Sequence, residues 1–236
     1  MHDLTPGGPQ LELARRLIAT GKPVTVVMID GRPETLFDVA DQCAALVAAW
    51  YPGEEGSTAL AELLFGDANF AGKLPVTFPR HVGQLPVTHD RTPSGGGFYH
   101  APGTPDRPGR DYVFGNTHPA FEFGYGLGYS RLEYRDITAE ATSDGIRVTV
   151  TVENCGDYAA DESVPVFLRD EVASIPQPQK KLVAIGALTL APGETATAEV
   201  LIPTEALTFT NARLERVLEP GWFTVMAGGL EARVQI

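Results

Sequence analysis

Cysteine is scarce in this chain: only two of its 236 residues, Cys43 and Cys155, carry a thiol. Two cysteines without C-x-x-C spacing support neither a disulfide framework nor a zinc site. They also fall in segments that we predict below to be different domains. We therefore expect two buried structural thiols that form no disulfide.

Long apolar runs are also missing. No run approaches the roughly 18 residues that cross a bilayer. The N-terminus, Met1 to Pro6, lacks the basic and apolar regions of a secretory signal. These features predict a cytoplasmic protein that does not bind membranes.

Basic residues are in the minority, with 18 Lys and Arg against 30 Asp and Glu and a net charge of −12. Nucleic acids and anionic membranes bind clusters of Lys and Arg, so neither is an expected partner. A neutral ligand such as a sugar needs no such cluster.

The motif of a serine hydrolase is absent, and that of a dinucleotide-binding loop is incomplete. The chain has no G-x-S-x-G elbow, which argues against a serine hydrolase. Gly124, Gly126 and Gly128 imitate a dinucleotide-binding loop, but the strand-like residues 131–134 follow instead of the helix that such a loop requires. Glycine at every second position instead allows another backbone to approach closely.

The first half of the chain has the pattern of an α/β fold. A helix is predicted from Pro9 to Thr20, with Gly21 as its stop. The apolar run 24–29 is typical of a strand buried on both faces of a parallel sheet. A second strand at 44–50 would run parallel to it, after a crossover helix at about 36–42.

Two acidic residues, Glu54 and Glu55, lie between the second strand and a helix predicted at 57–65. Ligands of open α/β sheets bind beyond the carboxyl ends of the strands, so both are candidate cleft-wall residues. The alternative is structural, because carboxylates at a helix start offset the positive end of its dipole.

Residues 87–118 are rich in glycine and proline and predict a long surface loop. His89 and Arg91 at its start are further candidate cleft-wall residues. The loop histidines, His89, His100 and His118, have no metal-ligand spacing, so we expect no metal site. Solvated or hydrogen-bonded histidines are the simpler interpretation.

After the glycine-rich junction at 119–130 the sequence predicts only strands and turns. Alternating or short apolar runs recur at 146–152, 164–168, 181–190, 195–202 and 219–225. This spacing is typical of an all-β sandwich of the immunoglobulin type. We predict an α/β domain at 1–130, including the loop 87–118, and a β-sandwich domain at 131–236.

Several motifs in sequence order resemble signatures of glycoside hydrolase family 3, the β-glucosidase and β-xylosidase family. They are Trp50–Gly56 (WYPGEEG), Ala61–Asn69 (AELLFGDAN), Ala71–Pro79 (AGKLPVTFP), Gln84–Pro86 (QLP) and Phe121–Ser130 (FEFGYGLGYS). Phe70 stands where the family usually has Pro, and Gly128 where it usually has Ser. Residues 131–236 resemble the fibronectin III-like domain of many family members, so the resemblance covers nearly the whole chain.

This resemblance implies a truncated α/β domain of the family, followed by the fibronectin III-like sandwich. Family members use an Asp nucleophile in an N-terminal (β/α)₈ barrel and usually a Glu acid/base at the start of the second domain. The segment from Asp3 to Gln10 resembles the end of that acid/base stretch, so the expected Glu would fall before Met1. Neither Glu54 nor Glu55 matches a catalytic position, and adjacent carboxylates seldom reach the separation of about 5–10 Å that flanks a scissile bond. We therefore assign no catalytic residue within the chain.

The resemblance implies the C-terminal part of a retaining, exo-acting β-glycosidase that is inactive alone and uses no cofactor. A β-linked glucoside or xyloside would be its substrate only together with a barrel, which a separate subunit could supply. Surface left uncovered by the missing parts predicts self-association. The alternative is a non-catalytic module that binds carbohydrate or pairs with another subunit.

Overall fold

The computed structural model describes residues 4–92 and 118–236. They form two compact units, and each is described by itself below. Within the described residues, the first unit comprises 4–68, 74–88 and 118–125, and the second comprises 69–73, 89–92 and 126–236. Most of the predicted loop 87–118, including His100, lies outside the described residues.

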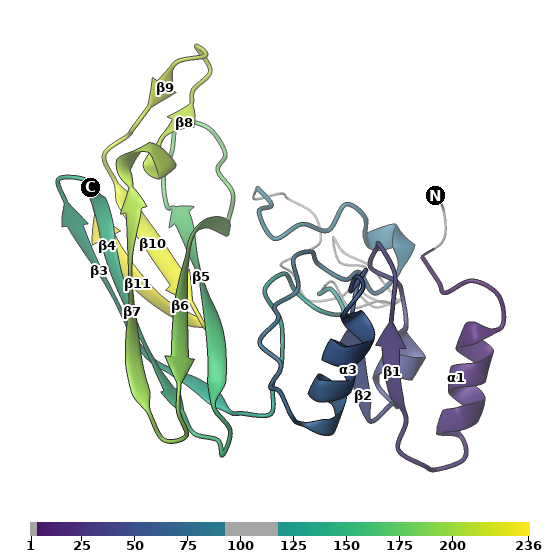
Figure 1. The fold of residues 1–236 in the computed structure, drawn as a ribbon. Coiled ribbons are helices and arrows are strands. Elements are labelled where there is room, and N and C mark those ends of the chain that lie inside the picture. The colour runs from purple at the N-terminus through teal and green to yellow at the C-terminus, as the bar shows by residue number, and fades with distance from the viewer. Residues whose placement is uncertain (1–3, 93–117) are drawn as a thin grey trace, which may run out of the picture. The chain divides into compact units, whose positions relative to one another are not determined.

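The first unit has the predicted α/β character (Figure 1). Its elements are α1 (Gln10–Ile18), β1 (Thr25–Met28), α2 (Phe37–Ala40), β2 (Ala45–Ala48), α3 (Gly56–Phe65) and the short 3₁₀ helix η1 (Val82–Gln84). Strands β1 and β2 pair in parallel, with Val26 opposite Leu46. The two parallel strands and the crossover helix between them are therefore confirmed.

The burial predicted for β1 is wrong. Thr25 is exposed, and Val26, Val27 and Met28 are only half-buried. The physical reason is that, within the described residues, β1 has β2 as its sheet partner and both are edge strands. A strand needs neighbours on both sides and layers on both faces to become fully buried.

Helix α1 exposes a polar face, on which Arg16 Nε lies 2.8 Å from Glu12 Oε1. It also exposes apolar side chains, because Leu13 is 59% and Leu17 46% exposed. None of its residues is buried. The helix therefore presents an apolar stripe to solvent within its own unit.

The second unit is a β-sandwich (Figure 1). Its strands are β3 (Leu132–Thr142), β4 (Gly145–Asn154), β5 (Ala160–Asp170), β6 (Lys181–Leu190), β7 (Thr195–Pro203), β8 (Phe209–Thr210), β9 (Arg216–Val217), β10 (Trp222–Ala227) and β11 (Leu230–Gln235), with the 3₁₀ helix η2 at Thr204–Leu207. One sheet has the order β11-β10-β5-β6 and the other β3-β4-β7, while β8 and β9 form a separate hairpin.

The sandwich core follows from the alternation seen in the sequence. Ile146, Val148, Val150 and Val152 of β4 are fully buried, whereas Arg147 between them is exposed. They pack in one cluster with buried residues of the facing sheet, among them Val164, Val166, Phe223 and Val225. Each such side chain contributes about 1.5–3 kcal/mol when it leaves water.

A buried asparagine fixes the turn between β4 and β5. Asn154 is fully buried, and its amide donates to the carbonyl oxygens of Tyr158, at 2.7 Å, and Leu190, at 3.1 Å. Its Oδ1 accepts hydrogen bonds from Ser130 Oγ and from the Gly156 N–H. All its polar atoms are thereby satisfied, which buried amides require.

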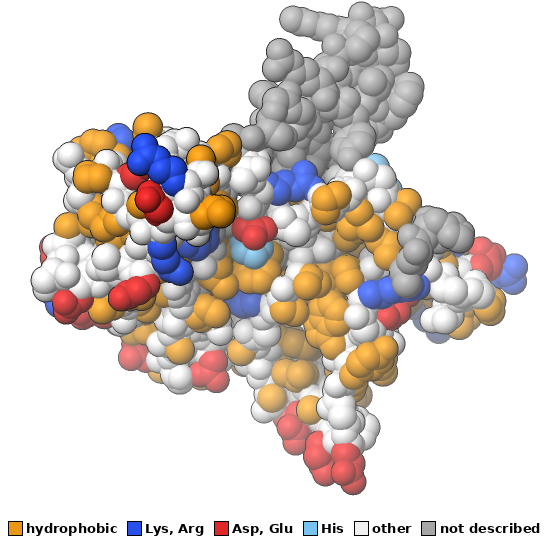
Figure 2. All heavy atoms as spheres, turned by 90° about the horizontal axis from the view of Figure 1, so that it is seen from above, with side chains coloured by type: hydrophobic (Ala, Val, Ile, Leu, Met, Phe, Trp, Pro, Cys, Tyr) orange, Lys and Arg blue, Asp and Glu red, His pale blue; other side chains and the backbone are white. Residues whose placement is uncertain are grey.

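The second unit carries charged side chains of both signs on the face that Figure 2 shows. Several are paired, as Arg147 Nε is with Glu199 Oε1 at 3.1 Å and Arg135 Nε with Glu153 Oε2 at 2.6 Å. Pairs this exposed contribute little stability.

Both cysteines are free, and each is half-buried rather than buried as predicted. Cys43 lies in the first unit and Cys155 in the second. Burial raises the pKa of the Cys43 thiol, which keeps it protonated near neutral pH. Among the residues that the structure describes, no helix is long and apolar enough to span a membrane.

Candidate functional site at the carboxyl end of the parallel strands

The turn that follows β1 brings polar groups to the carboxyl edge of the parallel sheet. The Arg32 N–H donates to Asp30 Oδ1 over 3.1 Å, which closes an Asx-type turn. Arg32 Nη2 lies 3.7 Å from Glu34 Oε1. Three charged side chains of one short turn thus meet where open α/β sheets bind their ligands.

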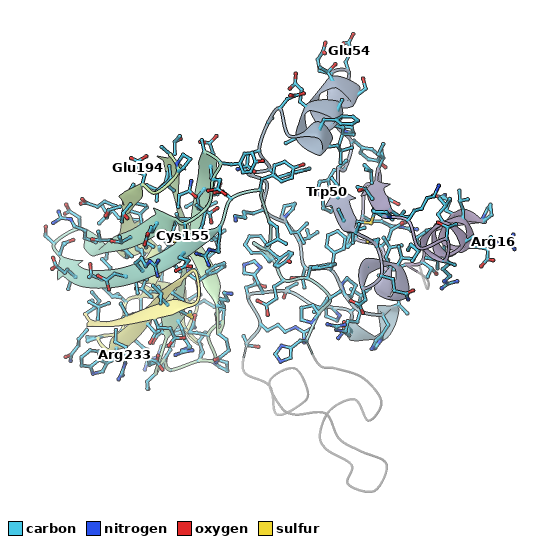
Figure 3. All side chains as sticks on the ribbon, turned by 90° about the horizontal axis from the view of Figure 1, so that it is seen from below. Arg16, Trp50, Glu54, Cys155, Glu194 and Arg233 are labelled. Carbon is cyan, nitrogen blue, oxygen red and sulfur yellow. The ribbon has the colours of Figure 1, made fainter. Side chains whose placement is uncertain are left out.

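Aromatic residues follow β2 at the same edge. Tyr51 lies against Gly31, where an added Cβ would be 2.8 Å from the tyrosine hydroxyl oxygen, so a larger residue at position 31 would displace the tyrosine ring. Trp50, labelled in Figure 3, has a φ of 53°, in the left-handed region that bulky residues rarely adopt. Its ring meets Phe78 edge-on, with centroids 5.9 Å apart.

Glu34 is the most perturbed carboxyl group of this edge. Its side chain is 11% exposed, and it borders a small cavity of about 20 Å³. The other lining residues are apolar: Met28, Leu36, Ala40, Leu46, Phe78, Ala120 and Phe121. Burial, and then the hydrogen bond and charge of Asp30, raise the pKa of Glu34 to about 7. The same hydrogen bond lowers the pKa of Asp30.

Asp30 and Glu34 therefore share one proton near neutral pH, because two adjacent carboxyl groups cannot both ionise cheaply. Such a pair can donate or accept a proton. It cannot act as the two carboxylates of a glycosidase, since these must stand about 5–10 Å apart on either side of the bond. The edge can instead offer an acidic hydrogen-bonding group and an aromatic wall.

The predicted cleft-wall residues Glu54 and Glu55 do not join this arrangement. Glu55 is the N-cap residue of α3, without a side-chain capping hydrogen bond, and both side chains are exposed. Figure 3 shows Glu54 at the beginning of the helix. Neither residue borders the cavity beside Glu34.

His89 and Arg91 belong to the second unit. The His89 ring meets the Phe167 ring of β5 edge-on at 5.9 Å, and burial lowers the pKa of His89. The carbonyl oxygen of Arg91 accepts a hydrogen bond from the Gln179 N–H at 2.8 Å. The four predicted cleft-wall residues therefore do not form one site within either unit.

Among the described residues, no group of three His, Cys, Asp or Glu side chains is placed to hold a metal ion. At this edge the structure shows hydrogen-bonding groups and aromatic rings.

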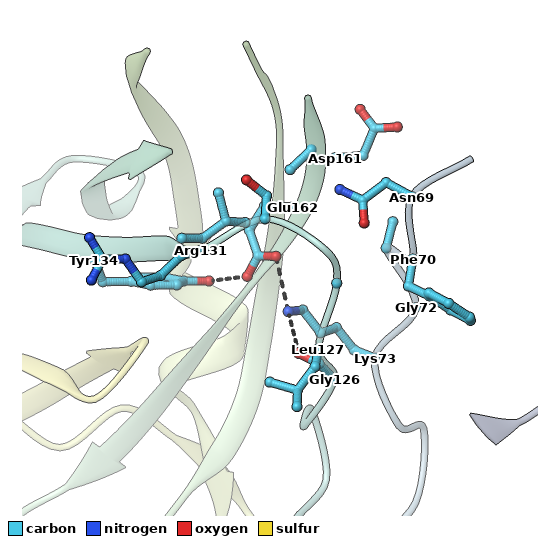
Figure 4. Close-up of a pocket in the computed structure, with 15 residues that line it drawn as sticks. Asn69, Phe70, Gly72, Lys73, Gly126, Leu127, Arg131, Tyr134, Asp161 and Glu162 are labelled. Carbon is cyan, nitrogen blue, oxygen red and sulfur yellow. Dashed lines mark hydrogen bonds and ion pairs between the residues drawn. The ribbon is translucent and has the colours of Figure 1, made fainter. Parts of the chain in front are cut away.

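Sequence reasoning missed a second polar cluster, which lies wholly in the second unit (Figure 4). Lys73 Nζ lies 2.9 Å from Glu162 Oε2, and the Tyr134 hydroxyl donates to Glu162 Oε1 over 2.7 Å. A signal was present in the sequence. Glu162 occupies an inward-facing position of β5 between Ala160 and Val164, where a charged residue requires a buried partner.

Comparison with known proteins supports the family resemblance that the sequence motifs indicated. The profile of the glycosyl hydrolase family 3 C-terminal domain matches residues 2–129, and that of the fibronectin type III-like domain matches residues 162–230. The chain belongs to glycoside hydrolase family 3. Both domains follow in the order that the resemblance implied.

Relatives within family 3 are much longer than this chain. A beta-xylosidase of Formosa agariphila is 37% identical over 234 residues, which are 96% of this chain and 31% of that protein. A periplasmic beta-glucosidase of Salmonella typhimurium is also 37% identical, over 96% of this chain and 30% of its own length. The chain thus corresponds to the C-terminal region of such proteins.

Solved β-glucosidase structures contain the same fold. A beta-glucosidase from Listeria innocua in complex with glucose superposes with a TM-score of 0.85 at 33% identity, over 98% of this chain and 33% of that one. A β-glucosidase from Erythrobacter marinus superposes with a TM-score of 0.87 at 36% identity, over 99% and 30% respectively. The chain therefore spans about a third of the structures that it resembles.

Proposed function

We propose that this chain is the C-terminal part of a retaining, exo-acting β-glycosidase that removes glucose or xylose from β-linked substrates. The observation that carries the proposal is the match of 96% of the chain to about 30% of a beta-xylosidase and a beta-glucosidase. Both relatives are named for hydrolysis of β-glycosides.

The chain requires a barrel polypeptide for this activity. Retaining hydrolysis needs a nucleophile and an acid/base on opposite sides of the glycosidic bond. The close carboxyl pair of the first unit, Asp30 and Glu34, lies on a single turn and shares a proton. We propose that both catalytic carboxylates come from polypeptide that precedes these residues in the family.

The carboxyl edge of β1 and β2 would then contribute to the surroundings of the sugar. Trp50 and Tyr51 supply aromatic faces, and Asp30, Arg32 and Glu34 supply hydrogen-bonding groups. Sugars are neutral and amphipathic, so they suit a wall that combines the two.

The experiment is an assay of the purified chain on aryl β-glucoside and aryl β-xyloside, alone and mixed with a family 3 barrel polypeptide that includes the acid/base stretch. We expect no hydrolysis by the chain alone and hydrolysis by the mixture. Hydrolysis by the chain alone would refute the proposal. Sugar binding without hydrolysis in the mixture would instead favour a non-catalytic module.

A further inference from the structure

Five residues of the chain, 69–73, belong to the second unit although residues 68 and 74 on either side belong to the first. Asn69 is one anchor of this loop. Its amide donates to the Ala159 carbonyl oxygen over 2.8 Å, and its Oδ1 accepts the Tyr129 N–H over 2.7 Å. One side chain thereby satisfies two backbone groups of the sandwich unit.

Glycines allow the loop to lie close to the backbone of residues 126–128. A Cβ on Gly128 would come within 2.6 Å of the Phe70 carbonyl oxygen, and one on Gly126 would overlap the Gly72 carbonyl oxygen. The Phe70 ring also meets the Tyr129 ring edge-on at 5.7 Å. The close approach predicted from the alternate glycines is confirmed, and its partner is this loop.

Lys73, the last residue of the loop, binds the second unit through its side chain. Its Nζ lies 2.9 Å from Glu162 Oε2 and donates to the Gly126 carbonyl oxygen over 3.3 Å. The Glu162 side chain is 5% exposed, and its other oxygen accepts the hydrogen bond of Tyr134 (Figure 4). The Tyr134 ring in turn packs so closely on Gly228 that any Cβ there would overlap it.

A buried carboxylate depends on both of these partners. Removing the positive partner of a buried ion pair leaves a charge without compensation, which is strongly unfavourable. Burial, then the bond to Glu162, raises the pKa of Tyr134, so its hydroxyl stays a donor. Losing Lys73 would leave the Glu162 carboxylate buried without this positive partner, with the Tyr134 hydroxyl still bound to it.

A cavity of about 280 Å³ lies beside these residues. Several polar side chains that line it are already engaged: Asn69 with backbone groups, Ser130 with Asn154, and Lys73 and Tyr134 with Glu162. A ligand would have to compete with these bonds. The geometry favours a structural use of the cluster.

We propose that Lys73, Glu162 and Tyr134 form a clamp by which the fibronectin III-like unit keeps the loop 69–73 in place, and that closure of this clamp maintains the order of neighbouring segments of the α/β unit. These segments are α3, which ends at Phe65, and residues 74–78, where the Leu74 N–H bonds to Tyr125 O and the Phe78 N–H to Phe121 O. This role of the sandwich does not depend on catalysis.

The test is hydrogen exchange of the whole chain, measured by mass spectrometry on peptides that cover α3 and residues 74–78. In K73M we expect these amides to exchange at least about tenfold faster, because local opening becomes easier. The matched control is R147M, which removes the exposed pair of Arg147 with Glu199 from the same unit. R147M should leave the exchange of α3 and 74–78 unchanged.

E162Q provides a second variant in case K73M does not fold. Gln keeps the shape of Glu162 and can still accept the Tyr134 hydrogen bond, so we expect faster exchange of the same amides with a smaller increase. The proposal is wrong if exchange in the clamp variants rises only within the sandwich strands. It is equally wrong if α3 and residues 74–78 exchange no faster than in R147M.

Discussion

The Glu34 carboxyl group and the Asp30 carboxylate, four residues apart on the turn after β1, are hydrogen-bonded to each other. Glu34 is the more buried of the two and is the protonated donor, while the Asp30 carboxylate accepts the hydrogen bond. This relationship gives the α/β unit a group that titrates near neutral pH. Its consequences for stability can be measured directly.

Stability of the first unit should fall as the pH rises from about 4.5 to 7. The folded-state pKa of Glu34, about 7, lies above its ordinary value of 4.5, so in this window the folded state binds more protons than the unfolded state. The resulting stabilisation is complete below pH 4.5 and is lost as the pH passes 7. The lowered pKa of Asp30 acts below this window, where stability falls as the pH decreases. Between pH 4.5 and 7 we therefore expect Glu34 to account for a loss of about 1–2 kcal/mol.

E34Q tests this dependence, because Gln can still donate to Asp30 but does not titrate. Urea unfolding at several pH values should show a smaller slope for E34Q than for the parent protein, and a more stable variant at pH 8. E55Q, which alters an exposed carboxylate, is the control and should retain the parent slope. Equal slopes in all three proteins would contradict the shared proton.

Replacing Gly126 by Ala should destabilise the second unit by about 1–3 kcal/mol, since the new Cβ would overlap the Gly72 carbonyl oxygen. Gly72 offers a matched control on the opposite side of the contact. No atom lies within 4 Å of a Cβ at Gly72, so G72A should be tolerated. Thermal unfolding of both variants gives the comparison. A G126A protein as stable as G72A would show that the close contact of residue 126 with the Gly72 carbonyl oxygen does not limit stability.

Replacing Leu214, at the tip of the β8–β9 hairpin, by glycine should increase the stability of the second unit. Its φ of 65° is in the left-handed region, and its side chain is 87% exposed, so it loses little packing. We expect L214G to gain about 0.5–1 kcal/mol in the free energy of unfolding. L13G in helix α1 removes another exposed leucine but should lose about 1 kcal/mol, because glycine weakens a helix.

Apolar side chains on the first unit should make the isolated chain self-associate. Phe65 is 86%, Ile29 60% and Leu13 59% exposed within their unit. Large exposed apolar side chains can associate with those of another copy to leave water. Sedimentation velocity should show a mass that rises with protein concentration and rises less for F65S. L214S, which alters a comparably exposed leucine of the other unit, should not reduce it, and a concentration-independent monomer would overturn the prediction.

The strands of the sandwich can be predicted from the sequence because the alternation of apolar and polar residues lies within each strand. The alternation from Ile146 to Val152 reports directly which side chains of β4 face the core. Strand β3 was recognised only at its beginning, since Glu133, Arg135 and Asp136 obscure its pattern. Strand β11 was missed for the same reason, because charged residues interrupt its few apolar positions.

The polar clusters were less accessible to sequence reasoning. The Asp30–Glu34 pair depends on how one turn folds and on the apolar cavity beneath Glu34, neither of which leaves a pattern in the chain. The partner of Glu162 lies 89 positions earlier at Lys73, and no local rule connects them. The burial of β1 was overestimated because an apolar run predicts a strand but not how many neighbours it has.

The most direct test of the account is to locate the covalent intermediate of retaining hydrolysis. An activated 2-fluoro-glycoside traps this intermediate, and intact-mass spectrometry then shows which polypeptide carries the sugar. In a mixture of this chain with a family 3 barrel polypeptide, the account predicts a label on the barrel and none on this chain. A stoichiometric label on this chain would contradict the account, because the nucleophile would then lie within these 236 residues.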